Sequence, residues 1–130
     1  MSLMNNKNDN IVKEFKELLL EKEADLESTA FFQPEKSAAE KFLNKLNYDE
    51  FFYVLNAWNI GREILNTPKG FKERLASYET KGRLFNDDLE ELKRGFRHRS
   101  EAEWYFMEKK EFLIKESLDH YFFIFTSFED

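Results

Sequence analysis

Residues 47–66 read NYDEFFYVLNAWNIGREILN, and this stretch decides the fold that we expect. Asn47 and Glu50 have the spacing of a capping box, so they predict the start of a helix over residues 48–66. Apolar side chains then recur at helical spacing on two faces, one with Phe51, Val54, Leu55, Trp58 and Leu65, the other with Tyr48, Phe52, Ile60 and Ile64. A helix that is apolar on two faces is typically central in its domain. Gly61 would allow a neighbouring helix to approach closely, at a cost of about 1 kcal/mol in helix propensity.

Shorter amphipathic patterns flank this stretch on both sides. Helix-start signals, such as Ser37 with Glu40 and Thr67 before Pro68, punctuate them. The patterns predict helices over residues 10–26, from Pro34 to Leu46, over 68–80, over 87–95 and from 100 to about 125. We expect residues 28–33 to form a loop with Phe31 and Phe32 turned inward.

Three local signals set the expected boundaries in the second half of the chain. Gly82 suits a left-handed residue after helix 68–80. Asp87 with Glu90 marks the next helix start, and Gly95 its end. Ser100 with Glu103 has the capping spacing that would open the last helix.

The composition predicts an all-α protein. Phe is unusually abundant, at 15 of 130 residues, whereas strand-favouring Val, Ile and Thr are scarce. We therefore expect one domain over residues 1–130, a compact bundle or orthogonal array of five to six amphipathic helices with a Phe-rich core. A second methionine at position 4 indicates that residues 1–8 are disordered or an expression scar.

The residues that are missing exclude several classes of protein. The chain has no cysteine, which rules out disulfides, thiolate metal sites and cysteine nucleophiles. No apolar run approaches the length of a membrane span, so we expect no membrane contact and a soluble, cytoplasmic protein. Phosphate-loop and nucleophile-elbow motifs are absent, so we expect no cofactor and favour a non-enzymatic role.

The aromatic tail Tyr121–Phe125 is ambiguous. So short an apolar run fits a buried helix as well as a strand. No partner strand is evident elsewhere, so we expect helix. The run is either core or a contact between copies of the chain, and core is the more frequent outcome.

Charge is unevenly distributed along the chain. The net charge is −6, yet all six arginines lie between Arg62 and Arg99, densest around Arg94, Arg97, His98 and Arg99. Arginine binds carboxylates and phosphates through paired hydrogen bonds, so this Arg-rich edge (62–99) is a candidate binding surface. The alternative is a solvated face whose arginines complement a helix end or pair with Glu101 and Glu103.

Trp104 lies among polar residues, and we expect it to be partly exposed. An exposed tryptophan beside arginines has the composition of an interaction hot spot. For metals, the nearest pattern is Glu116 with His120, four residues apart, which is half a site at best. A surface hydrogen bond is the simpler interpretation, and we expect no metal.

The sequence leaves three functional hypotheses open. The first is a small acidic interaction or regulatory protein that binds another protein through the Arg-rich edge and Trp104. Its acidic remainder offers a second face, by analogy with small acidic proteins that cover a basic active site. The second is a nucleic-acid-binding protein that uses the same edge, which the net charge disfavours. The third is an enzyme or carrier with an apolar ligand in its aromatic core.

Overall fold

A computed structural model describes residues 6–20 and 37–127, and these residues form an all-α protein. The α-helices are α1 (Asn6–Leu18), α3 (Ala38–Lys45), α4 (Tyr48–Asn66), α5 (Pro68–Ala76), α6 (Lys81–Gly95), α7 (Arg99–Met107) and α8 (Glu111–Phe123), and a 3₁₀ turn, η1 (Phe125–Ser127), follows. The predicted fold class is confirmed, with one helix more than the upper limit expected. Within the described ranges, no helix combines the length and apolar character that crossing a membrane requires.

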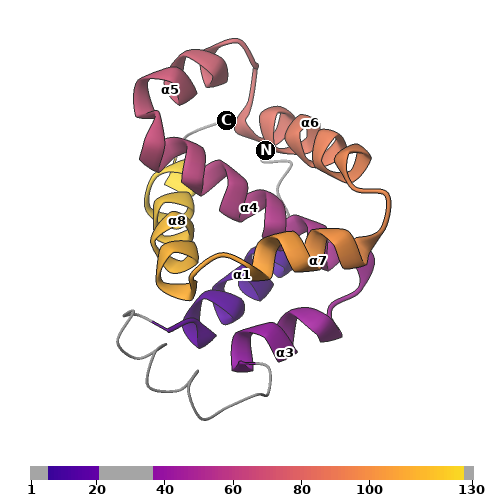
Figure 1. Ribbon diagram of the computed structural model, residues 1–130. Helices are drawn as coiled ribbons and strands as arrows, with labels where there is room; N and C mark the ends of the chain where they lie inside the picture. The colour runs from indigo at the N-terminus through magenta and orange to yellow at the C-terminus, as the bar shows by residue number, and fades with distance from the viewer. Residues whose placement is uncertain (1–5, 21–36, 128–130) are drawn as a thin grey trace.

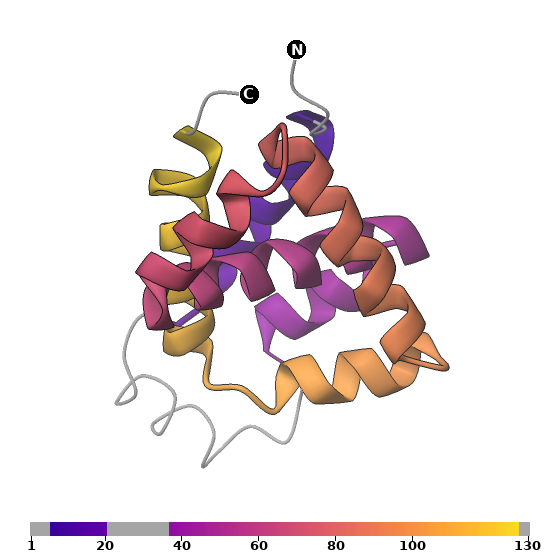
Figure 2. The same ribbon diagram turned by 90° about the horizontal axis from the view of Figure 1, so that it is seen from above.

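Helix α4 is the centre of the fold, as the sequence predicted. The other helices are arranged around it (Figures 1 and 2). Every residue from Phe51 to Trp58 is buried, so this part of the helix meets packed neighbours all round. The predicted capping box is present, with the Asn47 side chain accepting from the Glu50 amide at 2.8 Å and the Glu50 carboxylate accepting from the Asn47 amide at 3.0 Å.

Gly61 is the point at which α4 and α8 cross. A Cβ atom built on Gly61 would lie 1.8 Å from the backbone oxygen of Ser117 and 2.7 Å from its carbonyl carbon. Helix α4 also packs against α8 more extensively than against any other helix. The close approach expected of Gly61 is therefore confirmed, and only glycine fits there without moving a backbone.

The core is built from aromatic rings, as the composition predicted. Phe106 of α7 lies 5.7 Å from Phe15 of α1 and 5.1 Å from Trp58 of α4, measured between ring centroids. Seven phenylalanines are almost completely buried, namely Phe15, Phe51, Phe52, Phe71, Phe85, Phe106 and Phe125. Tilted and edge-on ring pairs at these distances stabilise a core beyond the apolar area they bury.

The predicted start of a helix at Asp87 is wrong. Helix α6 begins six residues earlier, at Lys81, because the Thr80 hydroxyl accepts from the Arg83 amide at 3.1 Å and caps it. Gly82 consequently lies in the first turn of α6 and does not end the preceding helix, which stops at Ala76. None of the described glycines has a positive φ.

The predicted last helix is two helices. Helix α7 begins after His98, whose amide donates to Glu101 at 3.2 Å, so Ser100 and Glu103 are not its cap. The chain then leaves the helical path near Lys110 and restarts as α8 in a different direction (Figure 1). The buried face explains the break, because it steps by five residues from Phe106 to Glu111, which a continuous helix would place on different sides.

The aromatic tail is helical through Phe123. Tyr121 and Phe125 are buried, whereas Phe123 is 72% exposed. Phe122 and Ile124 are partly buried against the core, and association through the tail stays a prediction.

The first helix differs from its predicted bounds. Helix α1 begins at Asn6, so residues 6–8 belong to it, and it ends at Leu18 instead of residue 26. The expected loop over 28–33 and the helix start at Pro34 lie outside the described residues. The Ser37 cap of α3 is confirmed, with its hydroxyl accepting from the Glu40 amide at 3.2 Å.

One half-buried carboxylate holds α1 in place. Asp9 accepts hydrogen bonds from the hydroxyls of Tyr53 on α4 at 2.8 Å and Tyr121 on α8 at 2.7 Å. Burial raises the pKa of Asp9 above its ordinary value of 3.8, although both hydrogen bonds and Lys81 act in the opposite direction. The charged carboxylate therefore carries a desolvation cost that the protonated form avoids.

This raised pKa predicts that the difference in unfolding free energy between the wild type and Asp9→Asn depends on pH. A carboxyl whose pKa is higher in the folded state contributes stability below its unfolded pKa and loses it as pH rises through the folded pKa. Wild-type stability relative to Asp9→Asn should thus be greatest at about pH 3–4 and fall toward neutral pH. Urea denaturation of both proteins across this range measures the difference. A constant difference, or one that grows with pH, would contradict the assignment.

Candidate functional site

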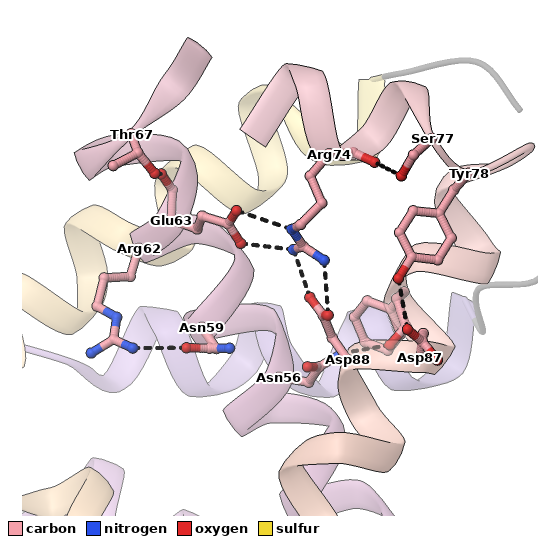
Figure 3. Close-up of polar contacts among 11 residues, drawn as sticks. Asn56, Asn59, Arg62, Glu63, Thr67, Arg74, Ser77, Tyr78, Asp87 and Asp88 are labelled. Atoms are coloured by element: carbon pink, nitrogen blue, oxygen red, sulfur yellow. Dashed lines mark hydrogen bonds and ion pairs between the residues drawn. The ribbon is translucent and has the colours of Figure 1, made fainter. Parts of the chain in front are cut away.

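The six arginines predicted as a binding edge have different roles in the structure. Arg74 of α5 lies between Glu63 of α4 and Asp88 of α6 (Figure 3). Its guanidinium donates to the Glu63 carboxylate at 2.7 and 3.1 Å and to the Asp88 carboxylate at 2.8 and 3.0 Å. Burial alone would lower the pKa of Arg74, but the two carboxylates outweigh it and raise that pKa. Arg74 thus joins three helices and is not placed to receive a partner.

Arg99 also makes its contacts within the fold. Its guanidinium donates to the backbone carbonyl oxygens of Leu43, at 2.8 Å, and Leu46, and so satisfies the C-terminal end of α3. It also pairs with Glu103 at 2.5 Å and lies over the ring of Phe51. The predicted alternative, an ion pair of this arginine with Glu103, is therefore present.

Three other predicted site residues remain at the surface. Arg94, in the last turn of α6, and Arg97, in the link to α7, are exposed and make no ion pair with another described residue. His98 is exposed at the N-terminal end of α7. Arg83 of α6 is exposed as well but pairs with Glu79 at 3.2 Å, so Arg94 and Arg97 are the exposed arginines of the predicted edge that make no ion pair with a described residue.

Trp104 is the most distinctive exposed residue near this edge. It lies on the side of α7 opposite the buried Ala102 and Phe106, and its side chain is 70% exposed. Two hollows meet at it. One, of about 360 Å³, lies between α3 and α7, and the other, of about 490 Å³, is lined by Phe96 and Tyr105 as well. The partial exposure predicted for Trp104 is confirmed and exceeded.

The lining of both hollows is acidic. The first contains the carboxylates of Glu40, Glu103 and Glu108, and the second contains that of Glu101. None of the described residues that line the two hollows is a lysine or an arginine. Neither Glu40 nor Glu108 makes an ion pair with another described residue, so no described cation compensates these two charges. We call Trp104, the two hollows and these four glutamates the Trp104 surface.

The sequence did not point to Glu40 as part of this surface. Glu40 belongs to α3, and only the packing of α3 against α7 brings it beside Trp104. The tether from Arg99 to α3 sets that packing, and it spans more than fifty residues of chain. No local pattern could have revealed it.

The candidate metal pair shows the simpler of its two predicted arrangements. His120 Nδ1 lies 3.0 Å from the backbone carbonyl oxygen of Glu116, one turn earlier in α8. Across residues 6–20 and 37–127, no group of three or more His, Asp or Glu side chains could hold a metal ion.

Comparisons with known families, with characterised proteins and with solved structures find no significant match to this chain.

Proposed function

We propose that this chain is a non-enzymatic interaction protein that binds a basic segment of another protein at the Trp104 surface. The observation that carries the proposal is the 70% exposure of Trp104 between two hollows lined by carboxylates. Tryptophan is enriched among residues that dominate binding energy, because its large ring fills a partner's pocket or receives one of its side chains. A cytoplasmic location remains part of this proposal.

The chemistry of the surface favours lysine or arginine side chains as ligands. A cation can lie over the exposed face of Trp104 and gain a cation–π interaction. The uncompensated carboxylates of Glu40 and Glu108 would pair with the same cation or a neighbouring one. The net charge of −6 would attract such a partner over distance. Exposed Arg94 and Arg97 lie outside the lining of both hollows, so they do not oppose it.

Trp104→Ser should abolish most of the binding. We would select ligands from a displayed library of random peptides and measure the best of them by fluorescence anisotropy. Selected peptides should be rich in lysine and arginine. Trp104→Ser should weaken their binding about 30-fold, which is the effect of losing a hot-spot residue. Phe123→Ser is the matched control, because Phe123 is equally exposed on another helix.

A charge-matched pair of variants tests the carboxylates. Glu40→Gln with Glu108→Gln should weaken binding several-fold, whereas Glu73→Gln with Glu90→Gln changes the net charge equally at exposed sites elsewhere and should not. The proposal fails if selected peptides are not basic or if Trp104→Ser binds them as tightly as the wild type. A single-stranded DNA oligonucleotide that binds and is lost with Arg94→Ser and Arg97→Ser would instead support a nucleic-acid partner.

A further inference from the structure

A third cleft lies on a different part of the molecule, between the C-terminal half of α4 and the junction of α7 with α8. Its volume is about 260 Å³. Its apolar lining comes from Trp58, Leu65 and Leu113, and its polar lining from Arg62, Asn66, Lys109, Lys110 and Ser117. Leu113 is 47% exposed, which leaves an apolar side chain at the cleft beside charged groups.

The charge of this cleft is opposite to that of the whole chain. Three cations and no carboxylate are found among the described residues that line it, in a protein whose net charge is −6. None of the ion pairs between described residues involves Arg62 or Lys109. The positive charges of Arg62 and Lys109, gathered in a concave site and paired with no described carboxylate, raise the local concentration of anions.

Arg62 is held in position by neutral groups. Its guanidinium carbon lies 4.5 Å from the ring centroid of Trp58, and Nη2 donates to Asn59 Oδ1 at 2.9 Å. Figure 3 shows it apart from the cluster of Glu63, Arg74 and Asp88, although it is adjacent to Glu63 in the chain. The side chain is thus oriented while its charge is not neutralised, which suits a guanidinium that binds an anion.

Lys109 has a comparable environment. Its ammonium lies 4.4 Å from the ring centroid of Tyr105, a neutral partner. The break between α7 and α8 places Lys109 and Lys110 in the same lining as Arg62, although more than forty residues separate them in sequence.

We propose that this cleft binds a small organic anion, a carboxylate or phosphate group attached to an apolar body. The anionic group would lie among Arg62, Lys109 and Lys110, and the apolar body would contact Trp58, Leu65 and Leu113. A few polar groups around an apolar lining are the usual composition of a ligand site. The proposal is independent of the Trp104 surface, which shares none of these residues.

Nuclear magnetic resonance titration tests the site directly. The probes are phenyl phosphate, benzoate, inorganic phosphate and the neutral control phenol, and the signal is the indole N–H resonance of Trp58, assigned with Trp104→Phe. Phenyl phosphate or benzoate should shift this resonance with saturation, and phenol and inorganic phosphate should each bind about tenfold more weakly or worse. The relative affinities of the first two probes distinguish a phosphate ligand from a carboxylate ligand.

Three variants locate the site without depending on one residue. Arg62→Gln and Lys109→Gln should each weaken the binding of phenyl phosphate about tenfold. Leu113→Glu should weaken it equally, because it places a carboxylate at the cleft. Lys69→Gln, exposed on α5, removes the same charge elsewhere and should leave binding unchanged. The proposal is overturned if phenol binds as tightly as phenyl phosphate, or if no probe shifts the indole N–H resonance of Trp58. It is also overturned if all three variants bind phenyl phosphate as tightly as Lys69→Gln does.

Discussion

Gly61→Ala should destabilise the protein by roughly 3 kcal/mol or more, although the same exchange stabilises most helices by up to about 1 kcal/mol. The added Cβ would lie 1.8 Å from the Ser117 carbonyl oxygen. That obstacle is backbone of α8, so no rotation of a side chain can relieve the clash. Helices α4 and α8 would have to separate along the most extensive helix contact in the described structure. Urea denaturation measures the loss.

Gly70→Ala is the matched control for this variant. Gly70 also lies in a helix, but the nearest atom to its Cβ position is the Thr67 Cβ, at an ordinary 3.8 Å. The control should gain about 0.5–1 kcal/mol, so the two exchanges should differ in sign. Equal effects at the two positions would show that α4 and α8 do not cross at Gly61.

Phe106→Ala should cost about 3–5 kcal/mol, the usual penalty for removing a buried phenylalanine ring. The Phe106 ring is completely buried and contacts both Phe15 and Trp58. Its removal leaves a cavity where α1, α4 and α7 meet. Densely packed rings cannot collapse into that space without leaving their own favourable positions. Thermal or urea denaturation would measure the change.

Two comparisons separate packing from other effects of this substitution. Phe106→Leu keeps most of the volume and should cost clearly less than Phe106→Ala. Trp104→Ala, two residues away on the exposed side of the same helix, should change stability by no more than about 0.5 kcal/mol. If Trp104→Ala proved the costlier exchange, α7 would present its other face to the core.

The central helix could be predicted closely from the sequence. Its signals are local and agree with one another, with Asn47 and Glu50 at the start, Thr67 before Pro68 at the end, and apolar residues on two faces between them. Gly61 also stood out, because glycine inside such a strong helix needs a packing reason. The structure supplies that reason at Ser117.

The predicted helix starts were wrong where residues that resemble helix caps take part in tertiary contacts instead. Asp87 with Glu90 looked like a helix start, yet Asp87 accepts from the Tyr78 hydroxyl at 2.6 Å, and the neighbouring Asp88 pairs with Arg74. Glu103 looked like half of a capping box, yet it pairs with Arg99. The break before α8 had a visible signal, because Lys109 and Lys110 interrupt the apolar spacing, but a charged pair on one continuous helix was an equally ordinary interpretation.

The candidate site could be predicted only in part. The polar neighbours of Trp104 in the sequence indicated its exposure. Arg99 donates to the end of α3, and Glu40 lies beside Trp104. Both arrangements depend on contacts between segments that are distant in sequence. Of the six arginines that are dense in the sequence, only Arg83, Arg94 and Arg97 are exposed, because contacts within the fold hold the others.

The contact between the first and the last described helices determines when the protein can fold during synthesis. Asp9 binds Tyr121, 112 residues later, and Lys16 binds Asp119, 103 residues later. While the chain is still emerging from the ribosome, α4 lacks the α8 surface that covers Gly61, and α1 lacks one of its two tyrosine anchors. Local helices form early, but contacts of such sequence separation require closure of a long loop. The aromatic core includes Phe125 and is thus completed only after residue 125 has left the exit tunnel.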